Sequence, residues 1–417
     1  MKPLPSLVAL ILLAASASCR QGGGASGGGS GPGTDPSPPP AGPGGTSPST
    51  PGDPSSGGAS EPPAPEPGVP AVQLVGRFDE RDPAGPKCGW PGCRVIARFW
   101  GTEVSARLVD DSGESGPSEW DVAIDGRWSS AKLVLSRTAR DYVLARDLPR
   151  GKHTVELYKR TEGQDGVTQF LGFDFAGGSL LPPPPRKTRR LEIVGDSDVA
   201  GFGYEGALGA DCTTAPKWWA RFENFRAAWG ERLAQKLDAE LNAVVFSGKG
   251  FYFNIWRPDL ETIGVLYPRS NPIDPTSTFD RSTFVPDVEV VSIGGNDYNM
   301  GQPEDTGPAP LDGFTQKARE LTSELRTSYP QAHIFLMAYA VLTDEYPPGR
   351  LRRTNVETAL KTVVKEHEDA GDARVYFVAP PPSVPAELTA CDGHGGPEYH
   401  ERIAQFMAET IAAKAGW

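Results

Sequence analysis

The sequence predicts a protein of two domains, in which an all-β sandwich is followed by an open α/β domain with a parallel five-stranded sheet. Three observations lead to this fold class. Short runs of alternating apolar residues fill 72–181, β-branched runs alternate with helix-like segments over 191–417, and a proline-rich linker at 182–190 separates the two patterns. Period-two alternation indicates half-buried strands, whereas alternating strands and helices favour a parallel sheet covered on both faces.

The first seventy residues are set apart by their composition. Residues 1–19 carry Lys2, an apolar stretch and small residues before Cys19, which is typical of an export signal. A cysteine in this position is where bacterial lipoproteins are lipidated, although Ser16 stands where a leucine is usual. We therefore expect the chain to be exported and lipid-anchored through Cys19 at the bacterial cell envelope or surface, with plain secretion as the alternative. Residues 20–70 are rich in Gly, Ser and Pro and predict a disordered tether.

The front domain is predicted from strands that repeat at short intervals, as in an all-β sandwich. The expected strands cover 94–100, 102–108, 120–124, 142–145, 153–158 and 169–173. Asp125-Gly126 and Arg150-Gly151 are expected to supply hairpin turns.

The back domain is predicted from five short apolar runs linked by four amphipathic segments. The expected strands cover 191–194, 243–246, 288–293, 333–338 and 375–379, and the expected helices cover 222–241, 311–329, 354–370 and 398–413. Parallel sheets of this kind bind ligands beyond the carboxyl ends of their strands.

The five cysteines fit an exported protein. With Cys19 reserved for the lipid, Cys88 and Cys93 bracket a Gly-Trp-Pro-Gly turn and are expected to form a local disulfide, which leaves Cys212 to pair with Cys391. A zinc site is the alternative use of these thiols, but the sequence has no CxxC or HExxH spacing, so we expect no metal.

The charge balance narrows the class of partner. A formal net charge of −12 with interspersed signs argues against nucleic acid and against an anionic membrane surface, so membrane contact is expected only through the lipid anchor. A neutral substrate, no cofactor and a monomeric chain are the expectations.

Three motifs follow predicted strands of the back domain and together suggest acyl-transfer chemistry. They are Gly195-Asp-Ser197, Ser247-Gly248 and Gly294-Gly-Asn-Asp297, and Asp392 and His394 stand near the far end of the chain. Acyl transfer needs a nucleophile, a base and donors for the oxyanion. We expect Ser197 to be the nucleophile, His394 the base and Asp392 the group that orients the imidazole.

The oxyanion donors are expected to come from the same turns. They are the N–H groups of Ser197 and Gly248 and the side-chain amide of Asn296, with Asp297 as a buried partner for neighbouring N–H groups. Asp198 is expected to cap the following helix rather than to raise the pKa of the histidine.

Each motif alone has a plainer explanation as a turn or a helix cap. The other histidines are expected to be structural; they are His153, His333, His367 and His400. The catalytic interpretation depends on the joint occurrence of the motifs, in order, at the ends of sheet strands.

The motif set resembles the SGNH (GDSL-type) hydrolase superfamily, whose four named residues correspond to Ser197, Gly248, Asn296 and His394. Segments of the front domain, among them Phe99-Trp-Gly-Thr102 and Gly151-Lys-His-Thr-Val155, resemble carbohydrate esterase family 2. The resemblance implies a flavodoxin-like five-stranded sheet behind a jelly-roll sandwich. It also implies a serine esterase that removes O-acetyl groups from a polysaccharide such as xylan or glucomannan.

Two features depart from the resemblance or extend it. The superfamily usually has Asp-x-x-His, whereas Asp392 is two residues from His394, and in the family some members orient the histidine with a backbone carbonyl instead. Three aromatic residues near the motifs, Tyr252, Trp256 and Tyr298, are candidates for sugar contacts, although aromatic side chains are more often core residues.

Other functions remain open from the sequence. One is an esterase for other acyl groups or for O-acetylated cell-wall glycans. Another is a surface glycan-binding lipoprotein with an inactive hydrolase domain, and a third is a structural envelope protein.

Overall fold

The computed structural model describes residues 68–113, 115–209 and 219–417. Cys19 and residues 20–67 of the tether therefore lie outside the described residues. Cys212 does too, so the predicted Cys212–Cys391 disulfide stays a prediction. The predicted disulfide between Cys88 and Cys93 is present in the structure.

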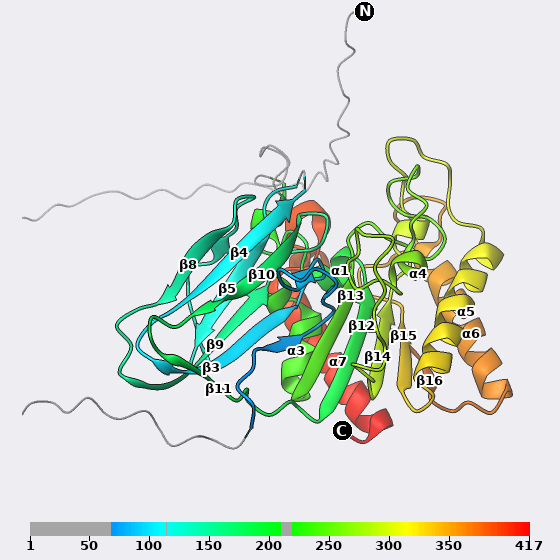
Figure 1. Ribbon diagram of the computed structural model, residues 1–417. Helices are drawn as coiled ribbons and strands as arrows, with labels where there is room; N and C mark the ends of the chain where they lie inside the picture. The colour runs from blue at the N-terminus through cyan, green and yellow to red at the C-terminus, as the bar shows by residue number, and fades with distance from the viewer. Residues whose placement is uncertain (1–67, 114, 210–218) are drawn as a thin grey trace, which may run out of the picture. The chain divides into compact units, whose positions relative to one another are not determined.

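The front domain consists of two antiparallel sheets (Figure 1). In one sheet the strands run β1-β3-β9-β5-β6, with β11 paired to β3 and β7 paired to β5, and in the other they run β2-β10-β4-β8. Their bounds are β1 Gln73–Val75, β2 Lys87–Cys88, β3 Arg94–Gly101, β4 Val104–Ser112, β5 Glu119–Ile124, β6 Arg127–Trp128, β7 Leu133–Val134, β8 Arg140–Ala145, β9 Gly151–Lys159, β10 Gly166–Asp174 and β11 Ser179–Leu181.

Alternating burial along β3 explains why the two sheets pack face to face. Val95, Ala97 and Phe99 are fully buried, while the residues between them are only partly covered. One face of the strand therefore enters the core of the sandwich and the other faces outward.

Of the two predicted hairpin turns, the first is confirmed and the second is wrong. Asp125 and Gly126 both have positive φ, 51° and 75°, and connect the paired strands β5 and β6 as a two-residue hairpin turn requires. The segment around Arg150-Gly151 instead connects β8, which pairs with β4, to β9, which pairs with β3 and β5. It crosses from one sheet to the other, because successive strands of a sandwich need not be neighbours.

The back domain has the predicted parallel five-stranded sheet, and this fold class is confirmed. The strand order is β13-β12-β14-β15-β16, and every pairing is parallel. The bounds are β12 Arg189–Gly195, β13 Ala239–Val245, β14 Val288–Ser292, β15 His333–Met337 and β16 Val375–Val378. Gly195 lies opposite Val245 and Ser292, so the segments that follow β12, β13 and β14 leave the sheet at the same edge.

Helices accompany this sheet, with α3 packed against α7 and α5 packed against α6 (Figure 1). The α-helices are α1 Ser197–Ala200, α3 Trp229–Lys236, α4 Ile263–Leu266, α5 Leu311–Ser328, α6 Arg352–Asp369 and α7 Pro397–Ala415. Short 3-10 helices cover Trp219–Phe222, Phe225–Ala227, Asn296–Tyr298, Pro385–Glu387 and Cys391–Gly393. None of the helices in the described part of the chain combines the length and the apolar character that crossing a membrane requires.

The helix predicted over 222–241 is shorter than expected. Asn224 accepts a hydrogen bond from the Ala227 N–H and caps a separate 3-10 turn, so the α-helix begins only at Trp229. At the other end Asp238 adopts a positive φ of 48°, and β13 begins at the next residue. The turn-forming tendency of Asn and Asp side chains prevails over the apolar periodicity here.

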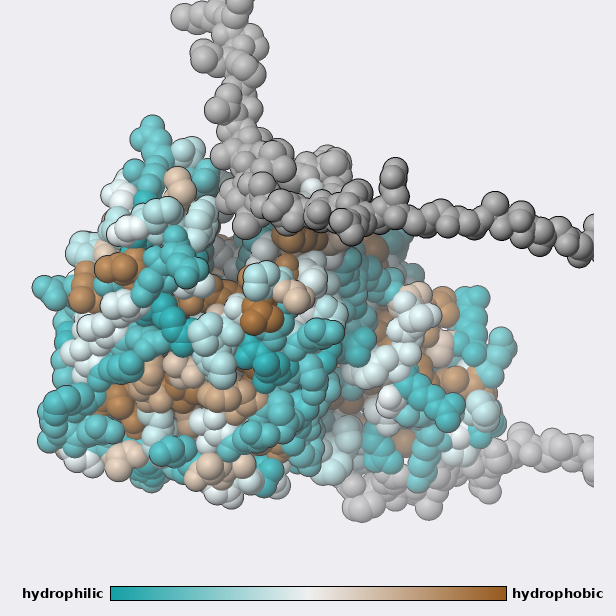
Figure 2. All heavy atoms as spheres, turned by 180° about the vertical axis from the view of Figure 1, so that it is seen from behind, coloured by the Kyte–Doolittle hydropathy of each residue, from teal (hydrophilic) through white to brown (hydrophobic). Residues whose placement is uncertain are grey.

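Ion pairs, in addition to apolar contacts, join the two domains. Arg77 of the sandwich lies 3.0 Å from Glu192 of β12, and both side chains are fully buried. Arg94 of β3 binds both carboxylate oxygens of Glu231 in α3 at 2.6 Å. The outer surface is different, since Figure 2 shows hydrophilic residues over much of one face with smaller hydrophobic areas between them.

Candidate active site

Ser197 is placed at the carboxyl edge of the sheet by a tight turn from strand to helix. Glycine is required at position 195, because a side chain there would lie 2.1 Å from Val199. Asp196 caps α1 by accepting a hydrogen bond from the Asp198 N–H at 3.1 Å. Ser197 is therefore the first residue of α1, and within the described residues its own N–H has no hydrogen-bond partner.

The structure brings Ser197 and His394 together, although 197 residues separate them in the chain. The distance from Ser197 Oγ to His394 Nε2 is 2.9 Å, and the distance from His394 Nδ1 to the carbonyl oxygen of Cys391 is also 2.9 Å. A carbonyl oxygen only accepts, so the proton of neutral imidazole lies on Nδ1 and leaves Nε2 free to accept from the serine hydroxyl. This is the arrangement of a nucleophile and its general base.

Asp392 does not occupy the orienting position that we expected. Its backbone has a positive φ of 54° and its side chain is exposed, while the same turn directs the preceding carbonyl, that of Cys391, toward the imidazole. The expected hydrogen bond from His394 to the Asp392 carboxylate is absent from this part of the described structure. A backbone carbonyl orients the histidine, and Asp392 acts on it only through its charge.

This geometry predicts a mild effect of Asp392→Asn. The change removes a charge but leaves the Cys391 carbonyl in place, so we expect kcat/KM for p-nitrophenyl acetate to stay within about threefold of wild type. An aspartate that holds the catalytic tautomer instead contributes about ten-thousandfold. A loss approaching that size in steady-state kinetics would contradict the carbonyl assignment.

The environment of His394 favours the neutral imidazole. Burial lowers the pKa of His394 and the positive charge of Arg352 lowers it further, whereas the Cys391 carbonyl and the Asp392 charge raise it, and the net pKa is below the ordinary 6.5. The ring also packs against Phe202, with 5.0 Å between ring centroids. His394 is thus a proton acceptor near neutral pH.

Asn296 connects the three segments that carry the predicted oxyanion donors. Its amide nitrogen donates to Asp196 Oδ2 at 3.1 Å, beside the nucleophile, and to the carbonyl oxygen of Lys249 at 2.8 Å, beside Gly248. Both amide hydrogens are therefore engaged, and donation to an oxyanion requires that one of these bonds be exchanged. The role of Asn296 as a donor stays a prediction.

Gly248 has the backbone geometry that the predicted oxyanion role requires. Its φ is +80°, and an added Cβ would lie 2.8 Å from Ile255. Both the backbone conformation and the lack of space therefore disfavour a side chain at this position. Its carbonyl accepts from the Ile255 N–H at 2.7 Å, while no hydrogen bond to its own N–H is formed among the described residues.

Asp297 is the buried partner for N–H groups that we expected. Its carboxylate accepts from the backbone N–H groups of Phe251, Tyr252 and Phe253 at 2.6–3.0 Å. Burial raises the pKa of Asp297 to about 6, although these three donors lower it. The carboxylate fixes the loop that follows Gly248 to the turn that carries Asn296.

Asp198 does not cap the helix, contrary to expectation, because Asp196 takes that position. The Asp198 carboxylate is buried and accepts from Tyr399 Oη at 2.5 Å and from Trp229 Nε1 at 3.1 Å. Burial raises the pKa of Asp198 to about 6. The side chain thus ties α1 to α3 and α7, which steadies the helix that presents Ser197.

Among the three candidate aromatic residues, the prediction that Tyr298 contacts a sugar is wrong. It is fully buried and packs against Phe314, so no ligand reaches its ring. Tyr252 is 36% exposed and lies against Gly313. Trp256 is 50% exposed and lies near Gly248, with its ring 3.8 Å from the position of a Cβ on that glycine.

The remaining histidines are bonded within the fold, as expected for structural residues. His400 is buried in α7 and accepts from the Trp229 N–H at 3.1 Å, and burial lowers its pKa to about 3. His153 lies between Asp125 and the Pro149 carbonyl in the sandwich.

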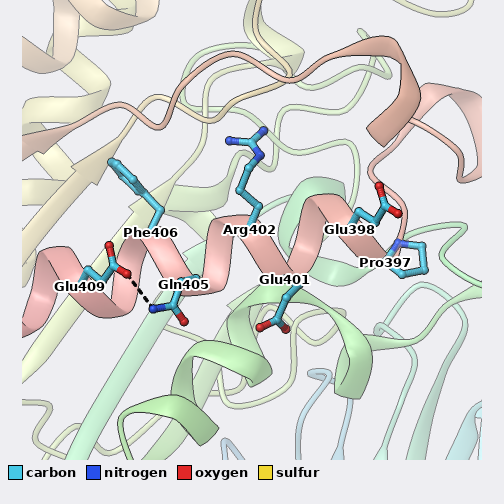
Figure 3. A pocket seen from close by; sticks show the side chains of 7 residues that line it. All are labelled: Pro397, Glu398, Glu401, Arg402, Gln405, Phe406 and Glu409. Carbon is cyan, nitrogen blue, oxygen red and sulfur yellow. Dashed lines mark hydrogen bonds between the residues drawn. The ribbon is translucent and has the colours of Figure 1, made fainter.

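A surface hollow lies apart from these residues along α7. Its lining includes Pro397, Glu401, Arg402 and Phe406, and their side chains project from successive turns of this one helix (Figure 3). It contains none of the predicted catalytic residues.

Sequence reasoning missed three residues that contact the site. Phe202 packs on His394, Tyr339 donates to Asp196 Oδ2 at 3.2 Å, and Glu162 of the sandwich binds Ser247. The glycines on both sides of Phe202 were a usable signal, since both have positive φ and the second packs closely against Cys391. The other two belong to distant segments, and no local pattern identifies them.

Two known families match this chain, and together the matches cover nearly all of the described residues. Residues 74–185 match the family described as carbohydrate esterase 2 N-terminal, and residues 193–412 match the GDSL-like lipase/acylhydrolase family.

Individual relatives agree with these matches. The chain is 32% identical to cellulase/esterase CelE of Acetivibrio thermocellus over 84% of its own length, but it spans 40% of that relative. It is 26% identical to an acetylxylan esterase / glucomannan deacetylase of Cellvibrio japonicus, covering 84% of this chain and 90% of that one. A solved family two carbohydrate esterase from Clostridium thermocellum, in complex with cellohexaose, has 31% identity and a TM-score of 0.74, covering 83% of this chain and 100% of that one.

Proposed function

Because the chain belongs to carbohydrate esterase family 2, whose members are carboxylic ester hydrolases, we propose that it removes O-acetyl groups from a carbohydrate such as xylan or glucomannan. The observation that carries this proposal is the 2.9 Å contact between Ser197 Oγ and His394 Nε2, with the Cys391 carbonyl on the other ring nitrogen.

In the first half of the proposed reaction, Ser197 Oγ gives its proton to His394 Nε2 and attacks the acetyl carbonyl carbon. The carbonyl oxygen becomes an oxyanion, for which the N–H groups of Ser197 and Gly248 and the amide of Asn296 are the proposed donors. When the tetrahedral intermediate collapses, the ester C–O bond breaks and the protonated histidine returns its proton to the departing sugar oxygen. The products are a free sugar hydroxyl and acetyl-Ser197.

In the second half, a water molecule gives a proton to His394 and attacks the carbonyl carbon of acetyl-Ser197. Breaking the bond to Ser197 Oγ releases acetic acid, and the imidazole proton returns to the serine. Every proton taken up by His394 is thus returned within the cycle, and this cycle needs no cofactor.

A carbohydrate as the alcohol part of the ester is supported by the relatives and by one exposed residue. The solved Clostridium thermocellum relative holds cellohexaose, and the Cellvibrio japonicus relative is named for xylan and glucomannan. In this chain the half-exposed indole of Trp256 beside Gly248 offers a flat apolar face of the kind on which sugar rings stack.

We expect Trp256→Ala to weaken binding of polymer and leave the chemistry intact. Loss of one stacking surface should raise KM for an acetylated polysaccharide by about two- to tenfold. KM for p-nitrophenyl acetate, which has no sugar, should change less than twofold. Leu260→Ala, a change at another exposed apolar residue of the same segment, serves as the control and should alter neither constant.

The test of the proposed function is acetate release. The wild-type protein is incubated with acetylated xylan, acetylated glucomannan and O-acetylated peptidoglycan, and mass spectrometry measures the acetyl content of each before and after. We expect deacetylation of a plant-type polysaccharide. Release from peptidoglycan alone would favour a cell-wall esterase, faster cleavage of butyryl than acetyl aryl esters would favour another acyl group, and binding without release would favour a glycan-binding protein.

We also propose that the protein is exported and held at the cell envelope by a lipid on Cys19. The support is the apolar leader, the small residues that follow it and the long Gly/Ser/Pro tether. Cys19→Ala should move the protein from the membrane fraction to the soluble fraction of an expressing bacterium. Wild-type protein recovered wholly in the soluble fraction would contradict the anchor.

A further inference from the structure

The loop that carries Gly248 is held by hydrogen bonds from several sides, but within the described part of the chain the Gly248 N–H is not one of the bonded groups. The Ile255 N–H binds the Gly248 carbonyl at 2.7 Å, the Asn296 amide binds the Lys249 carbonyl at 2.8 Å, and Asn254 Oδ1 accepts from the Gly250 N–H at 3.1 Å. Among the described residues the Gly248 N–H makes no such bond. The loop thus presents one backbone donor whose direction depends on the peptide unit between Ser247 and Gly248.

Ser247, which precedes this donor, is held from the other domain. Its backbone N–H donates to Glu162 Oε1 at 2.5 Å, and its hydroxyl donates to Glu162 Oε2 at 2.5 Å. No other hydrogen-bond partner of these two Ser247 groups lies within the described residues. A single carboxylate of the sandwich therefore fixes both the main chain and the side chain of the residue next to the oxyanion donor.

Glu162 is held rigidly enough for this task. It lies in the connection between β9 and β10 and is fully buried. Its own N–H donates to Glu223 Oε2 at 3.1 Å, and its carbonyl accepts from Lys159 Nζ at 3.2 Å. Gln164 Nε2 donates to its carboxylate at 3.2 Å. The carboxylate is thus braced within the sandwich before it reaches Ser247.

Burial is the largest influence on the pKa values of the ionisable groups around Glu162. Burial raises the pKa of Glu223 well above its ordinary value, and the neighbouring Glu162 and Asp165 raise it further. Burial also raises the pKa of Glu162, while its hydrogen bonds with Glu223 and Ser247 lower it, and the net pKa is above its ordinary value. Burial lowers the pKa of Lys159, whereas the neighbouring acids, Glu162 and Glu223 among them, raise it.

We propose that Glu162 is a positioning residue for the oxyanion hole, so that the β-sandwich supplies part of the catalytic geometry and is more than a carrier of the hydrolase domain. The inference rests on the proposed esterase function and on Gly248 as an oxyanion donor. Glu162 itself touches no substrate; it acts by fixing Ser247, which sets the direction of the Gly248 N–H. Preorganised donors of this kind stabilise the transition state more than the bound substrate.

The test variant is Glu162→Asp, which keeps the charge and withdraws the carboxylate by about 1.5 Å, one carbon–carbon bond. Bonds of 2.5 Å then lengthen beyond hydrogen-bond reach. The matched control is Glu119→Asp, the same change at a glutamate of the sandwich that is 1% exposed and binds Lys132 at 2.6 Å. Both are made in the full chain, and thermal unfolding confirms that each is folded.

For Glu162→Asp we expect kcat for p-nitrophenyl acetate to fall about ten- to a hundredfold with KM changed less than threefold, because loss of a whole oxyanion donor costs about a hundred- to a thousandfold. The Ki of an aryl trifluoromethyl ketone, which forms a tetrahedral adduct with the serine, should rise by the same factor as kcat/KM falls. Glu119→Asp should retain kcat within twofold. Wild-type kcat in Glu162→Asp, or equal losses in both variants, would overturn the inference.

Ser247→Ala provides a second test that holds even if Glu162→Asp does not fold. It removes only the hydroxyl contact, so we expect kcat to fall about three- to tenfold with KM unchanged; unchanged kcat would overturn the inference. Failure of the proposed function would appear differently, as an inactive wild-type protein or as an active Ser197→Ala variant.

Discussion

Replacing Ser197 by alanine is expected to lower kcat/KM for p-nitrophenyl acetate by at least about ten-thousandfold, because the variant has no oxygen that can form the acyl-enzyme. The geometry that sets this expectation is the 2.9 Å contact between Ser197 Oγ and His394 Nε2. Stability should change little, since among the described residues the hydroxyl has one hydrogen-bond partner, the partly exposed imidazole. Steady-state kinetics together with a thermal unfolding curve measure both quantities.

A control separates this effect from general damage. Ser323→Ala alters an exposed serine on α5 and should leave kcat/KM within twofold. Ester hydrolysis by Ser197→Ala at more than a few per cent of the wild-type rate would show that another group is the nucleophile.

The second large effect is expected for His394→Ala. The variant keeps the serine but has no group to accept its proton, so kcat/KM should fall by about a thousandfold or more. Added imidazole should restore a measurable part of the activity, since the deletion leaves space beside Ser197 Oγ. His367→Ala, at the far end of α6 where the side chain meets Asp372, is the control and should be fully active.

The same residue is expected to set the pH dependence of the wild-type enzyme. His394 must be neutral to act as the base, so activity is present above its pKa and is lost as pH falls through it. Because burial lowers that pKa, the acid limb of the kcat/KM profile should have its midpoint below 6.5. An acid limb centred well above 6.5, or one that persists unchanged in His394→Ala, would contradict the assignment.

The sequence was sufficient for the fold class because the two hydrophobic periodicities are local and strong. Four of the five parallel strands and the helices α5, α6 and α7 follow the apolar patterns closely, whereas β13 begins at Ala239, within the helix predicted over 222–241. The predicted element boundaries are wrong where a single polar residue turns the chain, as at Asn224 and Asp238 around α3. The Arg150-Gly151 segment failed for a different reason, since strand pairing depends on which sheet each strand joins, and no local pattern records that.

The side chains of the candidate site were predictable from the sequence, but the backbone group that orients the histidine was not. Ser197 and His394 lie together as the motif order suggests, but the orienting group is the carbonyl of Cys391, and a carbonyl has no residue type that a sequence can display. Tyr298 failed as a sugar contact because burial depends on packing against Phe314 of α5. Glu162 was missed because its partner, Ser247, is 85 residues away in the other domain.

The measurement that tests the central claim most directly is peptide mass spectrometry of the enzyme quenched in acid during turnover of p-nitrophenyl acetate. We predict that one acetyl group appears on the peptide containing Ser197, that Ser197→Ala shows none, and that His394→Ala accumulates it only slowly. Continued turnover without acetylation of Ser197, or an acetyl group on a different residue that turns over at the catalytic rate, would contradict the account.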